Sequence, residues 1–422
     1  MQKGIKTRYI AHEILFNLKN NNYNFDEILN SNYIKHNLSI SDRKMVHSIV
    51  LSSMRFSIHV GKIIPQYIKT KQKPQHWILF LSAITQIVYL NFKEYAVVNS
   101  TVELSKNKKI NMYPGFVNAV LKQIIKDKSK LQKIKIKFKE LPYWFLKEFK
   151  GCSKEEKVSF INSLTEKPNL HLVFKNTITK SFDKINSIKT SKKSLVILEN
   201  LPIKKLPGYV EGEWWVQDYS AMLPLYLTKN LHNKNVIDLC SAPGGKSLQA
   251  LSNGAILDLI EISPKRANLL QSNLTRLSFK NKVTIEDALK ISNFKKYDYV
   301  IVDSPCSSVG TIRRNPEIFF RKSKPNLEAF SIKQEKLLNK AKEILKKNGI
   351  ILYMVCSFLP IETTAQINKF LKKNNNFSVE KFIFNSDDKN IVDSNGYIKI
   401  VPKYFKKFNI DGFFAVKLIK ND

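Results

Sequence analysis

The stretch DLCSAPGGKS, from Asp238 to Ser247, decides how the C-terminal half of this chain folds. It follows the short apolar run NVIDL, which is typical of a buried strand, and it leads into a helix expected to begin near Lys246. Its end looks like a phosphate-binding P-loop, which needs another glycine ahead of four variable residues and Gly245. Cys240 stands at that position. We therefore expect a strand, a Gly-Gly turn and a helix that hold a ligand other than a nucleoside triphosphate.

The same order of strand, loop and helix recurs on both sides of this turn. AILDLIE precedes the helical SPKRANLLQSNLTRL, and YDYVIVD precedes SPCSSVG. A helix over 327–347, which we expect Gly349 to end, precedes the strand IILYMVCS. This alternation predicts an α/β, Rossmann-like domain over 221–422, with a mostly parallel sheet covered by helices on both faces.

The rest of the chain has a different pattern. Up to about residue 130 the apolar spacing is helical, with the capping-like SISD at Ser39 to Asp42 and a new helix after Pro114 and Gly115. Residues 131–220 mix basic, strand-like and turn-rich stretches. The sequence therefore predicts a multi-domain protein with an all-α bundle over 1–130, a small α+β connector over 131–220, and the α/β domain.

The charge of the chain points to a polyanionic partner. The formal net charge is +35, from 70 basic and 35 acidic residues. The alternative explanation is a general abundance of lysine in the source, because only eight of the 70 basic residues are arginine. Five of these arginines fall between Arg266 and Arg321, where we expect them to meet phosphate or carboxylate groups.

Several classes of protein are disfavoured. The apolar run from Trp77 to Phe92 is shorter than a bilayer-spanning helix and carries polar residues, and no secretory signal is visible. The four cysteines are far apart and have no partners at metal-ligand spacing. We expect a cytoplasmic monomer with no membrane, no metal and no disulfide.

Chemistry-bearing residues follow three of the predicted strands. The strand ends read Asp238-Leu239-Cys240, Asp303-Ser304-Pro305-Cys306 and Val355-Cys356-Ser357, and ligands bind at this edge of parallel sheets. The Gly-Gly turn allows close approach of the backbone to a ligand. Glu261 ends the next strand, where a carboxylate accepts hydrogen bonds from ribose hydroxyls. A nucleoside cofactor fits this pattern.

The motifs DLCSAPGGKS, DSPCSSVGTIRRNPE, VCSFLPIE and DGFFAVKL resemble those of bacterial RNA (cytosine-5)-methyltransferases, most closely the 16S rRNA (cytosine-5)-methyltransferase B subfamily. AVVNSTVELSK and GFVNAVLKQI are similar to its NusB-like RNA-binding domain. The chain departs from the usual motifs of this family at Val355, Glu261 and Thr363, and none of these departures removes a reacting group. The resemblance implies S-adenosylmethionine as cofactor, Cys356 as nucleophile and Cys306 as second thiol. It implies a cofactor site made of Cys240, Ser241, Ala242, Pro243, Gly244, Gly245, Lys246, Glu261, Asp287 by the adenine, and Asp303 where the cofactor meets the base.

This chemistry is consistent with the residues themselves. Carbon 5 of cytosine is a poor nucleophile, so a thiolate must first add to carbon 6, and the ring nitrogen then needs a proton, which Asp303 is placed to provide. A second thiol would assist the later release step. Arg313 and Arg314 follow the Cys306 loop and are expected to contact phosphate, although a scaffold role is the alternative. Alternatives for the whole chain are the same reaction on tRNA or another rRNA site, or a non-catalytic NusB-like RNA-binding or assembly factor.

Overall fold

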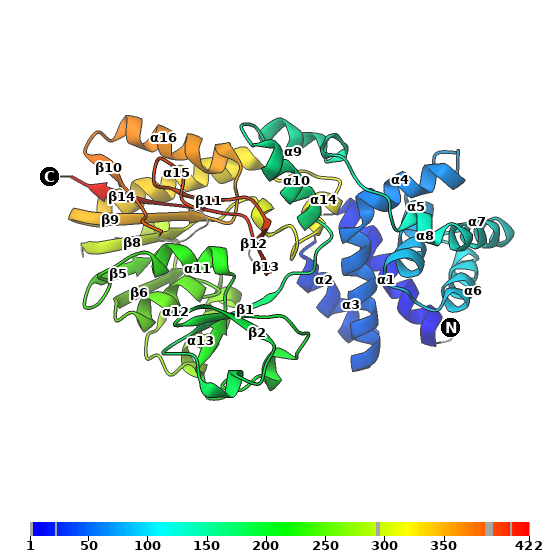
Figure 1. Ribbon diagram of the computed structural model, residues 1–422, viewed down its shortest axis with the longest axis horizontal. Helices are drawn as coiled ribbons and strands as arrows, with labels where there is room; N and C mark the ends of the chain where they lie inside the picture. Colours follow the sequence, from blue (N-terminus) through cyan, green and yellow to red (C-terminus); the bar gives the residue numbers. More distant parts are fainter. Residues whose placement is uncertain (1–2, 22, 293–295, 385–390, 406, 422) are drawn as a thin grey trace. The chain divides into compact units, whose positions relative to one another are not determined.

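The computed structural model describes residues 3–21, 23–292, 296–384, 391–405 and 407–421, and the chain forms two compact units (Figure 1). The first unit comprises Met1–Lys147 and Ile312–Pro325, and the second comprises Glu148–Thr311 and Asn326–Asp422. The segment 312–325 thus belongs to the first unit although it interrupts the second in sequence. The division into three domains at residues 130 and 220 remains a prediction.

All regular secondary structure in the described residues of the first unit is helical. Ser39 caps a helix as expected, because its hydroxyl accepts a hydrogen bond from the Asp42 amide at 3.2 Å. Pro74 and Pro114 each stand in the first turn of a helix, where proline is tolerated. The elements are α1 (Lys3–Asn20), α2 (Phe25–Lys35), α3 (Ile40–Arg55), α4 (Ser57–Tyr67), α5 (Pro74–Ile84), a π-helical turn (Thr85–Tyr89), α6 (Glu94–Ser105), α7 (Pro114–Lys126) and α8 (Lys128–Leu131).

The segment 312–325 is fixed to this helical unit by both apolar and polar contacts. It contains α14 (Glu317–Phe320), whose Phe320 is fully buried and stacks on Trp77 with ring centroids 6.3 Å apart. Arg55 of α3 donates a hydrogen bond to the Arg313 carbonyl at 2.8 Å, and Arg321 donates to the Tyr23 carbonyl at 2.7 Å.

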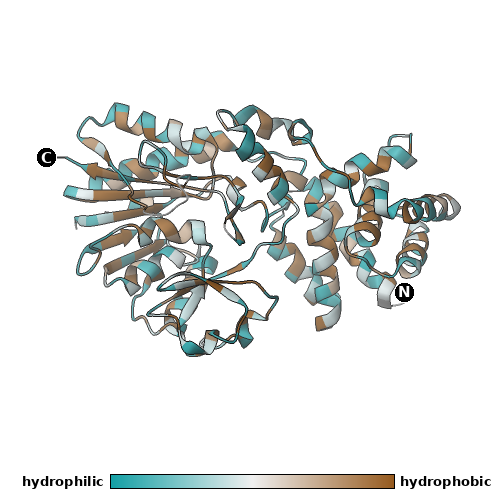
Figure 2. Cartoon of the chain, in the orientation of Figure 1, coloured by the Kyte–Doolittle hydropathy of each residue, from teal (hydrophilic) through white to brown (hydrophobic). Residues whose placement is uncertain are grey.

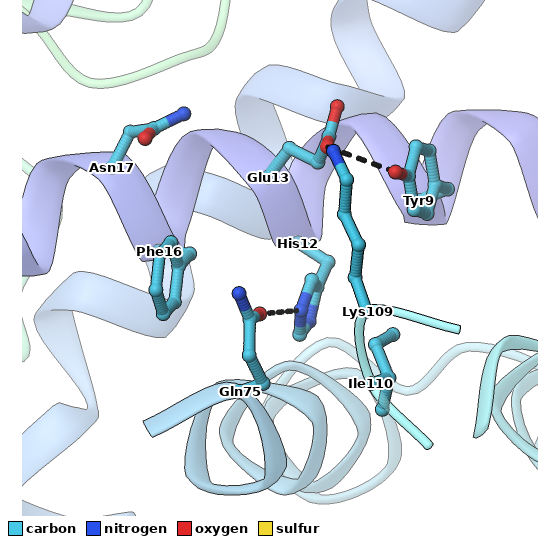
Figure 3. Close-up of a pocket in the computed structure, with 8 residues that line it drawn as sticks. All are labelled: Tyr9, His12, Glu13, Phe16, Asn17, Gln75, Lys109 and Ile110. Carbon is cyan, nitrogen blue, oxygen red and sulfur yellow. Dashed lines mark hydrogen bonds and ion pairs between the residues drawn. The ribbon is translucent and has the colours of Figure 1, made fainter. Parts of the chain in front are cut away.

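A cavity of about 270 Å³ lies in the first unit beside α1 and α5 (Figure 3). Glu13 accepts a hydrogen bond from the Tyr9 hydroxyl at 2.8 Å and pairs with the Lys109 ammonium at 3.1 Å. His12 Nε2 lies 2.7 Å from Gln75 Oε1. These pairs connect α1 to α5 and to the chain after α6.

The second unit is built on a large mixed sheet in the order β10-β14-β9-β8-β5-β6-β7, with β11 paired to β14. The five strands from β9 to β7 in this order are parallel, and β14 and β10 run antiparallel to their neighbours. The strands are β5 (Asn235–Asp238), β6 (Ile256–Glu261), β7 (Val283–Ile285), β8 (Tyr297–Asp303), β9 (Leu345–Val355), β10 (Phe377–Glu380), β11 (Ile398–Ile400) and β14 (Phe413–Lys420), beside a hairpin of β12 (Lys403–Phe405) and β13 (Phe408–Ile410).

Helices cover both faces of this sheet, as predicted, and the strands are largely hydrophobic (Figure 2). Along β9, Tyr353 and Val355 pack with α15 and α16, whereas Leu352 and Met354 pack with α11, α12 and α13. Successive side chains of a strand point to opposite faces, which explains this division. The helices are α11 (Tyr219–Tyr226), α12 (Gly245–Ser252), α13 (Pro264–Arg276), α15 (Leu327–Ile344) and α16 (Thr364–Lys373).

The connector region forms a separate antiparallel sheet in the second unit. Its order is β2-β3-β1-β4. Trp214 and Trp215 of β4 are buried, and the indole of Trp214 donates to the Pro207 carbonyl at 2.7 Å, so both tryptophans are packing residues. The helix α9 (Tyr143–Glu148) lies at the boundary between the two units, and the elements that follow it are α10 (Lys154–Ser163), β1 (Leu170–Phe174), β2 (Ser187–Ser191), β3 (Ser194–Ile197) and β4 (Trp214–Val216).

One expected boundary is wrong. Gly349 does not end the helix before β9, because α15 ends at Ile344 and the strand begins at Leu345. Asn348 takes the left-handed conformation, with φ of 57°. The pairing of β9 with β8 shifts register between Tyr297 and Tyr299, so the residues before Gly349 form an irregular start of the strand.

Among the described residues, no helix is both long and apolar enough to cross a membrane.

Candidate active site

The predicted site residues of the second unit lie at the carboxyl ends of the parallel strands in the large sheet. Asp238, Glu261 and Asp303 are the last residues of β5, β6 and β8, and Cys356 directly follows β9. Because these strands are parallel neighbours, their carboxyl ends meet at the same edge. Asp287 follows the edge strand β7, and its carboxylate accepts a hydrogen bond from the Leu289 amide at 3.1 Å.

The loop between β5 and α12 is shaped by Gly244, which has φ of +114°. A Cβ at this position would lie 2.5 Å from a methyl carbon of Leu270, so a larger residue would meet both steric and backbone strain. Asp238, before the loop, accepts a hydrogen bond from the hydroxyl of Ser247, after the loop, at 2.7 Å, and this bond connects the two ends of the loop. Burial, with a smaller contribution from the Asp303 charge, raises the pKa of Asp238 to about 7.

Cys240 lies in this loop and is an unreactive thiol in this environment. Burial and the charges of Asp238, Asp303 and Glu261 raise the pKa of Cys240, which disfavours its thiolate. Its predicted place in the cofactor loop therefore concerns its backbone and shape.

Glu261 is linked to the same loop. Its carboxylate accepts hydrogen bonds from the Ala242 amide at 3.3 Å and the Ser263 amide at 3.0 Å. Arg266 of α13 lies 3.7 Å from Glu261 and donates a hydrogen bond to the Ala242 carbonyl. Arg266 is one of the clustered arginines and meets a carboxylate, as predicted. Arg276 does not, because it donates to the Tyr209 and Trp214 carbonyls at 2.9 and 3.0 Å and is a scaffold residue.

Lys246 and Asp303 form an ion pair between the first turn of α12 and the end of β8. The ammonium nitrogen lies 2.6 Å from a carboxylate oxygen of Asp303 and 5.3 Å from the ring centroid of Phe413. Burial lowers the pKa of Lys246, but the charge and hydrogen bond of Asp303 outweigh burial, so the pKa is raised overall. Lys246 is therefore a stable cation at the strand ends.

Cys306 and Cys356 lie together beside this pair, with their sulfur atoms 3.3 Å apart. The hydrogen bond from Cys306 lowers the pKa of Cys356 and outweighs burial and the Asp303 charge, while Ser308 and Lys246 add to the lowering. The same hydrogen bond, together with burial and the charge of Cys356, raises the pKa of Cys306 well above its usual range. The pair therefore favours a thiolate on Cys356 and a protonated Cys306.

Glu362 holds the two thiol-bearing loops together, a role that the sequence analysis did not assign. The residue is fully buried in the 3-10 turn Pro360–Glu362. Its carboxylate accepts hydrogen bonds from the Ser307 amide at 2.7 Å, the Ser307 hydroxyl at 2.5 Å, the Ser357 hydroxyl at 2.6 Å and the Gln334 amide at 3.3 Å. Ser307 follows Cys306 and Ser357 follows Cys356, so one side chain sets the position of both cysteines.

The predicted RNA contacts, Arg313 and Arg314, belong to the first unit and differ in exposure. Arg313 is fully buried, whereas Arg314 is exposed. Of the two, only Arg314 presents its side chain to solvent. Phosphate contact by either remains a prediction.

Two family models match the chain. Residues 225–419 match the 16S rRNA methyltransferase RsmB/F model, and residues 5–126 match the NusB family model. The chain is similar to ribosomal RNA small subunit methyltransferase B of Shewanella oneidensis, with 27% identity covering 92% of each chain. It is also similar to the protein of the same name from Pasteurella multocida, with 25% identity covering 99% of this chain and 96% of that protein.

Solved structures show the same fold. The structure titled Crystal Structure of PH0851 covers 100% of this chain and 99% of its own, with a TM-score of 0.72 and 18% identity. The structure of NSun6 from Pyrococcus horikoshii with SFG covers 66% of this chain and 97% of its own, with a TM-score of 0.56 and 16% identity. The predicted fold class, a NusB-like bundle followed by a Rossmann-like methyltransferase domain, is confirmed.

The fold, the strand-end site and these matches define an RNA methyltransferase. More specifically, residues 225–419 are similar to the RsmB/F family of 16S rRNA methyltransferases, and the region before them, residues 5–126, is similar to the NusB family.

Proposed function

We propose that this chain transfers a methyl group from S-adenosylmethionine to carbon 5 of a cytosine in RNA through a covalent adduct with Cys356. The observation that carries the proposal is the pair of sulfur atoms 3.3 Å apart at the ends of parallel strands, next to the Lys246–Asp303 ion pair. A thiolate donor, a neutral thiol and a positioned carboxylate are the groups that this reaction requires.

The residues at the strand ends fit the proposed cofactor. Gly244 keeps the loop free of side-chain bulk, and Glu261 offers a buried carboxylate to ribose hydroxyls. The loop from Cys240 to Lys246 would lie along the cofactor, Asp287 would lie beside the adenine, and Asp303 would lie between cofactor and base. The bound cofactor supplies an electrophilic methyl group, which carbon 5 takes up while the electrons of the broken sulfur–methyl bond stay on sulfur.

Cys356 begins the reaction by adding to the base. Its thiolate forms a bond to carbon 6, the ring double bond moves to carbons 4 and 5, and ring nitrogen 3 takes up a proton. Asp303 would pass that proton to the ring from the Lys246 ammonium, which lies 2.6 Å away. Carbon 5 is then nucleophilic.

Cys306 has the properties needed for the release step. Its pKa is raised first by the hydrogen bond to Cys356, and then by burial and the charge of Cys356. When Cys356 is bonded to carbon 6 its charge is lost, so Cys306 can give its proton to solvent. The Cys306 thiolate then takes the proton from carbon 5, the double bond between carbons 5 and 6 re-forms, and Cys356 leaves as a thiolate. Ring nitrogen 3 returns its proton through Asp303 to Lys246.

The substrate is proposed to be small-subunit rRNA in the cytoplasm. The net charge of +35 supports a polyanionic partner, and the curated relatives are named ribosomal RNA small subunit methyltransferase B. A cytosine within a helix would have to be unstacked to reach the strand-end thiols.

Replacing each thiol separately tests this mechanism. We expect Cys356→Ala to abolish methylation, at least about a thousandfold, because no bond to carbon 6 can form. Cys306→Ala should still add to the base and then stall. This variant should accumulate a protein–RNA adduct that survives denaturing electrophoresis, measured with labelled RNA and S-adenosylmethionine.

The double variant is the matched control, and its adduct should disappear. An adduct in Cys356→Ala that is absent in Cys306→Ala would reverse the two roles. Retained methylation in Cys356→Ala would overturn the covalent mechanism, and bisulfite sequencing of RNA from cells with and without the chain would show whether the product is 5-methylcytosine.

A further inference from the structure

Ser308 has an unusual backbone conformation for its residue type and position. Eight described residues other than glycine have positive φ, and six of them are asparagine, which tolerates this conformation. The other two are Ser278, which directly follows Leu277, the C-cap residue of α13, and Ser308, with φ of 57° in the Cys306 loop. The left-handed conformation at the end of α13 is a common way to terminate a helix. Ser308 has no such explanation, because residues 304–308 form a loop.

The surrounding backbone imposes this conformation. The Gly310 amide donates to the Cys356 carbonyl at 3.0 Å, and the Thr311 amide donates to the Ser308 carbonyl at 2.9 Å. A Cβ at Gly310 would lie 2.0 Å from the Gly412 carbonyl oxygen, so the loop is tightly packed against the turn before β14. Glycine would satisfy position 308 without strain, yet serine is present.

The hydroxyl of Ser308 lies next to both thiols. Its oxygen is 3.4 Å from the Cys356 sulfur and 4.0 Å from the Cys306 sulfur. A neutral Cys356 thiol donates to this oxygen, whereas a thiolate accepts the hydroxyl proton. The left-handed backbone at residue 308 therefore directs the hydroxyl toward the cysteine that the mechanism uses as nucleophile.

We propose that Ser308 is a positioning residue that donates a hydrogen bond to the Cys356 thiolate, and that the loop keeps a serine in a left-handed conformation to supply this donor. The proposal deepens the proposed function, since it assigns the second donor to the same nucleophile. With both Cys306 and Ser308 donating, the sulfur anion has two hydrogen bonds before it adds to carbon 6.

The contribution of Ser308 to the pKa of Cys356 is compared with those of the charged groups near this thiol. Lys246 of α12 lowers the pKa of Cys356, and Asp303 of β8 raises it, as burial does. The hydrogen bond from Cys306 is the largest contribution, and the one to Ser308 is the other hydrogen bond that lowers the pKa. Lys246 is already paired with Asp303, and each of the two hydrogen bonds stabilises the thiolate more than this neighbouring cation does.

The test measures Cys356 directly, without RNA or cofactor. The full chain is alkylated with iodoacetamide between pH 5 and 9 under reducing conditions, and mass spectrometry follows the peptide that contains Cys356. We expect Ser308→Ala and Ser308→Gly to slow alkylation below neutral pH by about tenfold, because a hydrogen bond to a charged group is lost. The midpoint of the pH profile should move upward by a similar amount in both variants.

The two variants separate the hydroxyl from the backbone. Glycine relieves the left-handed conformation and alanine keeps a Cβ there, so equal pH profiles assign the effect to the hydroxyl. Ser304→Ala is the matched control, since that buried hydroxyl in the same loop has no hydrogen-bond partner among the described residues. An unchanged profile in both Ser308 variants, or an equal shift in Ser304→Ala, would overturn the proposal. Because alkylation requires no RNA, this outcome is independent of whether the chain methylates cytosine.

Discussion

At the scale of single residues, Asp238 makes the stability of the loop between β5 and α12 depend on pH. Its pKa is raised from 3.8 to about 7, with burial as the first cause, so the folded chain holds a proton that the unfolded chain releases. A raised pKa of an acid means that the folded state loses stability as pH rises from about 4 to about 7. The ionised carboxylate is thus disfavoured at the base of the loop.

We expect Asp238→Asn to remove this dependence. Asparagine matches the protonated acid and keeps a hydrogen-bonding group for Ser247. The free energy of unfolding of the variant, relative to the original chain, should rise by about 3 kcal/mol between pH 5 and 8, because the original chain loses about 1.4 kcal/mol for each pH unit between 5 and the folded pKa of about 7. Urea unfolding at the two pH values measures this difference. A difference that is the same at both values would show that Asp238 does not titrate in this range.

At the scale of elements, the site depends on two loops that follow β8 and β9. Neither loop is a helix or a strand at its cysteine, and Glu362 connects them through the two serines that follow the cysteines. In the absence of regular secondary structure, the buried carboxylate of Glu362 and its four hydrogen bonds keep the two loops in place.

Replacing Glu362 should therefore disorder both thiols together. Glu362→Ala leaves buried donors without partners, and we expect the free energy of unfolding to fall by about 3 kcal/mol or more, at about 1–3 kcal/mol for each unpaired group. The reactivity of Cys356 toward iodoacetamide should lose its low midpoint. Glu362→Gln is the control and should lose no more than about 1 kcal/mol, because an amide can still accept from Ser307 and bond the hydroxyls. Equal losses in both variants would point to the charge rather than the hydrogen bonds.

The sequence predicts the strand ends better than it predicts the loops between them. An apolar run that stops at a polar residue predicts a strand end, and this local pattern predicts the positions of Asp238, Glu261, Asp303 and Cys356. The contacts of Glu362 join residues 55 positions apart, and nothing local distinguishes it from a surface glutamate before folding. The motif VCSFLPIE, which contains Glu362, was the only sequence feature that indicated a role for this residue. The motif alone does not say which residues Glu362 contacts.

Segment 312–325 shows the same limit. Its sequence follows the Cys306 loop and lies within the α/β domain predicted over 221–422, but its aromatic side chains are buried in the helical unit. The burial of Phe320 against the helices outweighs the proximity of the segment to the cysteine loop in the chain. Domain membership depends on such long-range packing, which hydrophobic periodicity does not encode.

At the scale of the whole molecule, the excess of positive charge should make RNA binding strongly dependent on salt, because each neutralised phosphate releases counterions. Many lysines contribute to this charge. An individual contact is recognised by its effect on the salt slope, whereas a scaffold arginine changes stability and leaves the slope unchanged.

Arg313 and Arg314 should behave differently in this respect, since Arg313 is fully buried and Arg314 is exposed. We expect Arg314→Ala to reduce the slope of log binding constant against log salt by about 0.7–0.9, the value for one phosphate contact. Arg314→Lys should keep the slope, because it retains the charge. Arg313→Ala should instead lower the melting temperature with little change in slope. Fluorescence anisotropy with labelled RNA between 50 and 300 mM salt, roughly the range over which such slopes are measured, distinguishes these outcomes. A slope that stays constant in Arg314→Ala would assign the phosphate contacts to the lysine surface.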